Sequence, residues 1–233
     1  MALGRSAARG AVSLEQGADP GSARCPACGE PLFVWLEAEG WGPREDQVID
    51  RCENCGLAVA RNAVPDGEQA LAQLLSAAAA NGDGAPARED ARGELVIRAA
   101  NAGSLQAWLG AENWAALRPG EAGLKPTPKA ARLLLRRRGL EVERIGFPAA
   151  AGMASMWQTL LNLLTFHRDF ATEALARRLR PGSGRGRAAY AIDAIVTVLA
   201  AVPTAILAVL LEGGAVAARR GGVIEVSARP ARG

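Results

Sequence analysis

The chain has 233 residues, of which 49% are hydrophobic and 22% are charged. This composition excludes an intrinsically disordered chain, and the length suffices for one sizeable core or two small domains. The formal net charge of +3 is too small to favour nucleic-acid binding through overall charge, and four thiolates on one Zn²⁺ would lower it to about +1.

The N-terminal segment has no apolar run of the length found in signal peptides, although it contains Arg5 and Arg9. We therefore expect residues 1–23 to be a disordered N-terminus and the protein to be cytoplasmic. In that reducing compartment, paired cysteines bind metals more often than they form disulfides.

The four cysteines form two Cys-x-x-Cys-Gly pairs, Cys25 with Cys28 and Cys52 with Cys55. Two intervening residues let both thiolates of a pair turn toward one ion, and the glycine that follows can adopt a positive φ. The pattern predicts one zinc ion held by all four thiolates. Because four thiolates leave zinc no open position, the predicted site is structural, and no catalytic residue is predicted.

Two short strands are predicted between the cysteine pairs, at Pro31–Trp35 and Gln47–Arg51, joined by a turn at Gly40–Pro43. Together with the pairs they give the layout of a zinc ribbon over residues 24–60. The alternative is a redox dithiol, against which the two matched pairs with trailing glycines argue.

Residues 61–93 read as a helix and a linker. The Ala- and Leu-rich segment Gly67–Ala80 is predicted to be helical, and a polar linker follows to Arg92. Glu94–Ala99 then reads as a strand that is buried on both faces, because its apolar residues are consecutive.

Residues 94–150 continue with a short helix at Ser104–Leu109 and a longer helix that begins at Pro128. Thr127 is the predicted N-cap of the longer helix, and Gly139 lies where the chain should leave it. The basic cluster Arg136–Arg138 then lies in the last turn. It either complements the helix dipole in solvent or binds phosphate or nucleic acid.

Two further strands are predicted, at Glu141–Phe147 and at Val223–Ala228, the latter within the C-terminal segment 219–233. Between them, residues 151–218 form an apolar helical insertion. Its centre, Ala194–Leu211, is an uncharged stretch of 18 residues with basic residues on both sides. We expect a buried or membrane-surface helix pair formed with Met153–Phe166, and a helix that spans the membrane is the alternative.

An ordered set of short matches extends across the predicted strands and helices. Its members are Asn101, Ser104-Leu105, Leu109-Gly110, Trp114, Thr127-Pro128, Leu133–Leu135, Gly139-Leu140 and Arg220–Val226. Together with the ribbon, they resemble the C-terminal half of class I S-adenosylmethionine-dependent methyltransferases that carry an N-terminal zinc ribbon. The resemblance covers Arg24–Leu57 and about Glu94–Arg229. It implies an α+β fold or a truncated α/β, Rossmann-like fold of about three strands. These would correspond to the family's fifth, seventh and sixth strands, which are neighbours in that order.

The cofactor-binding half of that family has no counterpart in this sequence. The two glycine pairs that could form the D-x-G-x-G turn, at Gly82–Gly84 and Gly184–Gly186, do not follow a strand. About 35 residues separate the ribbon from Glu94, too few for four strand–helix units at roughly thirty residues each. We therefore expect no cofactor-binding residues, no S-adenosylmethionine binding by the isolated chain, and a non-catalytic binding or accessory protein.

Two alternative functions remain open. A partner chain could supply the cofactor half, so that the two chains form a split methyltransferase. The chain could instead be a zinc-ribbon adaptor for nucleic acid or protein that uses Arg24, Arg44, Arg51 and Arg61, although Trp35 and Trp41 read as core or hairpin residues rather than stacking platforms. His167, the single histidine, is expected to be an ordinary helix-surface or interface residue.

The absence of the family's cofactor-binding half predicts where the chain binds partners. The outer edge of the strand at 95–99 would lack its neighbour, so either Gly67–Ala80 covers it or a protein partner or second copy pairs with it. Residues 153–166 and 194–211 offer a surface for membrane association, and binding to nucleic acid is not expected.

Overall fold

The computed structural model describes residues 23–38, 47–80, 88–89, 94–117, 123–176 and 185–231. The predicted disordered N-terminus up to residue 22, the turn at 40–43 and most of the linker at 81–92 lie outside the described residues. Arg44 and Trp41 also lie outside them.

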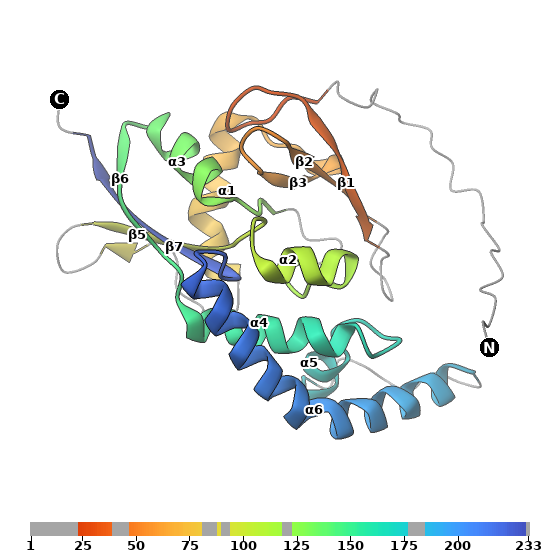
Figure 1. The fold of residues 1–233 in the computed structure, drawn as a ribbon. Helices are drawn as coiled ribbons and strands as arrows, with labels where there is room; N and C mark the ends of the chain where they lie inside the picture. Colours follow the sequence, from red (N-terminus) through yellow and green to blue (C-terminus); the bar gives the residue numbers. More distant parts are fainter. Residues whose placement is uncertain are drawn as a thin grey trace.

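The N-terminal sheet has three antiparallel strands in the order β1-β2-β3 (Figure 1). They are β1 (Leu32–Ala38), β2 (Gln47–Cys52) and β3 (Ala58–Ala60), and a 3₁₀ turn, η1 (Arg61–Ala63), follows. The two predicted strands are present. The third strand was not predicted, because three small residues carry no alternation.

The second sheet has four strands in the order β4-β5-β7-β6, and every pair is antiparallel. They are β4 (Arg88–Glu89), β5 (Leu95–Ala100), β6 (Leu140–Gly146) and β7 (Val223–Pro230). The described chain is therefore an α+β structure. Its three longer strands are neighbours in the order β5-β7-β6.

Neither face of β5 is fully buried, because Leu95 on one face and Val96 and Arg98 on the other are partly exposed, so the predicted burial of both faces is wrong. Ile97 and Ala99 are buried, whereas Arg98 points to the other face and is half-buried. Its Nε donates to the Glu225 carboxylate of β7 at 2.7 Å. The charged pair thus occupies the face that the consecutive apolar residues had suggested was part of the core.

The helices of the described residues differ in how their N-termini are capped. They are α1 (Gly67–Ala80), α2 (Leu105–Gly110), η2 (Ala111–Asn113), α3 (Pro128–Arg136), α4 (Ala149–Asn162), α5 (Phe170–Leu175) and α6 (Arg185–Ala217). The Ser104 and Thr127 hydroxyls accept from the Ala107 and Ala130 amides, and each thereby caps its helix. Pro128 is the first residue of α3, and Gly139 adopts a positive φ three residues beyond its end.

One hydrophobic cluster joins the two sheets. Residues of the ribbon (Cys25, Cys52, Leu57), of α3 (Leu134, Leu135) and of the second sheet (Ile97, Ile224, Val226) belong to one buried cluster. α1 lies beside it and contributes Leu71 and Leu74. The ribbon is therefore packed into the same core as the strands that follow it.

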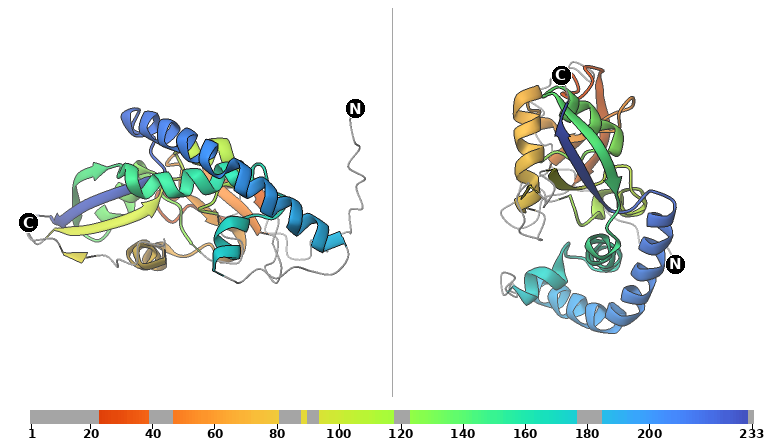
Figure 2. Two further views of the ribbon diagram at one scale, coloured as in Figure 1. Left: turned by 90° about the horizontal axis from the view of Figure 1, so that it is seen from below. Right: turned by 90° about the vertical axis from the view of Figure 1, so that its left-hand side faces the viewer.

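The apolar insertion forms a helical layer at the other end of the molecule from the ribbon (Figure 1). α4 and α6 pack side by side, so the predicted helix pair is present, and α6 extends beyond the predicted stretch at both ends. α6 curves around α4 and α5 (Figure 2) and contains Pro203, which removes one backbone hydrogen bond near its middle.

Candidate metal centre and its surroundings

The sulfur atoms of Cys25, Cys28, Cys52 and Cys55 all lie within 4.8 Å of one another. The Cys25–Cys55 and Cys28–Cys52 separations are 3.5 and 3.4 Å. Four thiolates on a tetrahedral ion with bonds of about 2.3 Å would have sulfurs roughly 3.8 Å apart. All four predicted ligands are therefore brought together, and their spacing fits a single metal ion.

The two cysteine pairs have the same backbone geometry. The Gly29 amide donates to the Cys25 carbonyl at 2.8 Å, and the Gly56 amide donates to the Cys52 carbonyl at 2.7 Å. Both glycines have a positive φ, 82° and 74°. This conformation favours glycine, which explains why one follows each pair.

The second cysteine pair is docked on the start of α3. The Thr127 hydroxyl donates to the Cys55 carbonyl, and Lys129 Nζ donates to the Asn54 carbonyl at 2.6 Å. A Cβ at Gly56 would lie 2.6 Å from the Thr127 methyl carbon, so the contact leaves no room for a side chain.

The first cysteine pair is docked near the end of α3. Arg137, in the turn that follows this helix, donates to the Pro26 carbonyl. The basic cluster Arg136–Arg138 is therefore not a uniformly solvated helix end, because one of its members holds the metal site. α3 thus lies along both cysteine pairs and fixes their relative position.

The thiols interact strongly when no ion is bound. The pKa of the Cys25 thiol is lowered to about 5, chiefly because the Cys55 thiol donates a hydrogen bond to it. The pKa of Cys55 is raised, first because its proton is engaged by Cys25 and second because it is buried. Burial also raises the pKa of Cys52. One thiolate is therefore present at neutral pH and can receive a cation.

Two of the arginines considered for an adaptor surface are engaged within the ribbon. Arg61 makes two hydrogen bonds to the buried Asp50 carboxylate, at 3.0 and 2.6 Å. Arg51 lies over the Trp35 ring at 4.9 Å, and that ring packs edge-on against the buried Trp114. Trp35 is accordingly a packed residue, as predicted.

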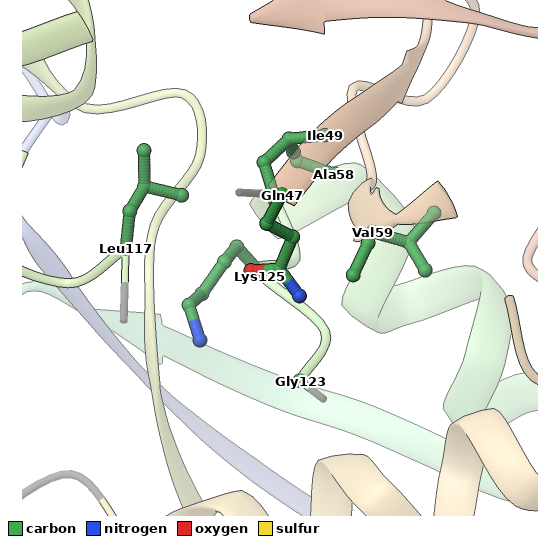
Figure 3. A pocket seen from close by; sticks show the side chains of 8 residues that line it. Gln47, Ile49, Ala58, Val59, Leu117, Gly123 and Lys125 are labelled. Carbon is green, nitrogen blue, oxygen red and sulfur yellow. The ribbon is translucent and has the colours of Figure 1, made fainter. Parts of the chain in front are cut away.

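Two hollows adjoin the ribbon and α3. A cavity of about 10 Å³ lies between β2, β3 and the segment before α3, lined by residues that include Gln47, Ile49 and Lys125 (Figure 3). It has room for about one water molecule. An open groove runs between α3 and β6, and its lining includes Lys129, Arg132, Arg136 and Glu141.

Two buried carboxylates, at the ends of the apolar stretch, hold α6 to the rest of the protein. Asp193 accepts from the Phe166 and His167 amides at 2.8 and 2.9 Å and from the His167 ring. Glu212 accepts from the Gln106 side chain at 2.7 Å and from the Gly222 amide at 2.8 Å. His167 is therefore an interface residue, as predicted, although it lies in the loop before α5.

Sequence reasoning missed the roles of Thr127, Arg137, Asp193 and Glu212 in holding distant segments together. In the sequence, Asp193 and Glu212 directly bound the uncharged stretch Ala194–Leu211.

Comparisons of the chain with protein-family models, with curated proteins and with solved structures found no match.

Proposed function

We propose that this chain is a non-catalytic binding or accessory protein, related to class I methyltransferases, whose ribbon is held by a structural zinc ion. The observation that carries the proposal is the closed cluster of Cys25, Cys28, Cys52 and Cys55, which is built into the core shared by both sheets. A metal with four protein ligands has no position left for a substrate. The site then stabilises a surface rather than performing a reaction.

Zinc is the metal that the donor set favours. Four thiolates in tetrahedral spacing suit zinc or iron, and ribbons built from two Cys-x-x-Cys pairs are typical structural zinc sites. The ion would join the two cysteine pairs and, through the hydrogen bonds of Thr127 and Arg137, fix them to α3. Its contribution would therefore extend to the second sheet.

The non-catalytic interpretation is supported by the segment between the ribbon and β5. Where the family resemblance calls for strands and a glycine-rich turn, the chain has α1, which packs against β5. The short strand β4 pairs with the first two residues of β5. The strand order β5-β7-β6 supports the relationship to methyltransferases.

Calorimetric titration of the zinc-loaded chain with S-adenosylmethionine tests this proposal. We expect no heat of binding at micromolar concentrations. S-adenosylhomocysteine, which differs from S-adenosylmethionine by the absence of the sulfonium methyl group, serves as a second ligand. Saturable binding of either one would contradict the non-catalytic function.

A split methyltransferase is the second candidate, and the edge of β5 favours it. Among the described strands, residues 97–100 of β5 pair with β7 alone, and in this candidate a strand from another chain would pair with the opposite edge. This candidate predicts that S-adenosylmethionine binding appears only when a partner chain is added. Binding by the isolated chain would contradict it.

The adaptor hypothesis has less support, because Arg51 and Arg61 are engaged within the ribbon. A nucleic-acid adaptor would bind oligonucleotides with an affinity that falls steeply with salt. We expect weak binding without such a slope.

A further inference from the structure

The inner face of α6 is fixed to the protein by its two buried carboxylates. Asp193 and Glu212 are both fully buried. Each of their carboxylates accepts two or more hydrogen bonds from other segments of the chain. Removing α6 from the protein would leave these carboxylates, and the amides of Phe166, His167 and Gly222, without partners. Burying an unpaired carboxylate in an apolar medium costs several kcal/mol.

The outer face of α6 is apolar and exposed. Its large side chains recur at helical spacing and include Ile195, Val198, Leu199, Val202, Ile206 and Leu210. Val198 and Leu199 are 75% and 73% exposed. Among the described residues, one helix, Arg187–Ala217, is long and apolar enough to cross a membrane, and 11% of its most apolar window is buried.

Basic residues lie at both ends of this apolar face. Arg187 is exposed and precedes Val198 by eleven residues, about three helical turns, so both lie on the same side of α6. Arg219, just beyond the helix, is exposed as well, whereas Arg220 donates to the Gly103 carbonyl. No acidic side chain between residues 187 and 217 competes with them on the outer face, because Asp193 and Glu212 are buried.

The shape of α6 matches this distribution of charge. The helix is convex on its outer side (Figure 2), so its apolar middle projects furthest from the protein while its basic ends are set back. A bilayer surface has the complementary order, with acyl chains below and phosphates above. Two copies of a convex helix could touch only over a short length, which disfavours a second copy as the partner.

We propose that α6 binds the surface of an anionic phospholipid membrane and lies in the plane of that surface. The residues from Ile195 to Leu210 enter the acyl chains, and Arg187 and Arg219 contact the phosphates. Asp193 and Glu212 keep the helix parallel to the surface, because a spanning orientation would break their hydrogen bonds. The ribbon then points away from the membrane (Figure 1). This inference is independent of the proposed function.

Vesicle co-sedimentation of the full chain tests the proposal. We expect stronger binding to phosphatidylcholine vesicles that contain phosphatidylglycerol than to phosphatidylcholine alone, by about tenfold at low salt. Val198→Glu should weaken binding by at least about tenfold, since a carboxylate would enter the acyl region. The matched control is Val34→Glu, an exposed valine of β1 at the other end of the molecule, which should leave binding unchanged.

A second measurement separates an in-plane helix from a spanning one. Nitroxide labels on Ile195→Cys, Val202→Cys and Val209→Cys, corrected for labelling of the native cysteines, report the depth of each position. The proposal expects three similar shallow depths, with Val202→Cys the deepest. Depths that change by about 10 Å from one label to the next would indicate a spanning helix and overturn the proposal.

Two other outcomes would also overturn it. One is an absence of vesicle binding by the folded, zinc-loaded chain. The other is a stable dimer in light scattering that Val198→Glu abolishes and that vesicles do not dissociate, because a second copy would then cover the apolar face.

Discussion

The Thr127 hydroxyl donates a hydrogen bond to the Cys55 carbonyl and accepts one from the Ala130 amide at 3.2 Å. One side chain therefore caps α3 and holds the second cysteine pair. The metal site and the second sheet are linked through this residue, since α3 packs on the strands of that sheet.

Replacing Thr127 with valine, which has nearly the same shape, tests this link. Thr127→Val should lower the free energy of unfolding by about 1–2 kcal/mol, because a helix cap and a buried hydrogen bond are lost together. Urea denaturation of the zinc-loaded protein measures the change. Thr127→Ser, which keeps the hydroxyl, is the control, and equal stability of the valine and serine variants would contradict the link.

The packing of α4 against α6 gives a second prediction. A Cβ at Gly152 would lie 1.9 Å from a Glu212 carboxylate oxygen, so Gly152→Ala must displace the buried carboxylate. We expect a loss of about 2 kcal/mol or more in thermal or urea unfolding. Gly213→Ala is the matched control on α6, where nothing lies within 4 Å, and it should be neutral or stabilising because alanine favours helix.

The coupled thiols give a prediction about protons. Cys25, with a pKa of about 5, is already ionised at pH 7, whereas Cys52 and Cys55 have raised pKa values and keep their protons. Zinc binding at pH 7 should therefore release at least two protons but fewer than four. Calorimetry in buffers of different ionisation enthalpy counts them, and a release of four would contradict the ionised Cys25. Zinc affinity should fall as the pH is lowered, because protons compete for the thiolates.

Much of the ribbon and of α3 could be predicted from the sequence, because local chemistry determines them. Neighbours within a few residues determine the glycine after each cysteine pair, the Thr127 cap and Pro128 at the first helical position. The metal ligands were predictable for the same reason, since their spacing alone brings each pair together.

The remaining features depend on contacts between distant segments. Arg98 can lie on one face of β5 because Glu225 lies opposite it on β7, and the sequence of β5 alone does not reveal that partner. Asp193 and Glu212 hold α6 in place by accepting hydrogen bonds from the amides of Phe166 and Gly222. No sequence pattern links these amides to the two carboxylates. β3 was missed because Ala58–Ala60 is short, and its partner Ile49–Arg51 is apparent only in the folded sheet.

The metal content of the purified protein tests the central claim most directly. Protein prepared without chelator should contain one zinc per chain by elemental analysis, and Cys55→Ser should contain none. Removing the ion should also loosen the second sheet, which shares its core with the cysteines. Protein without stoichiometric zinc that is nevertheless folded, with Cys55→Ser equally stable, would contradict the account.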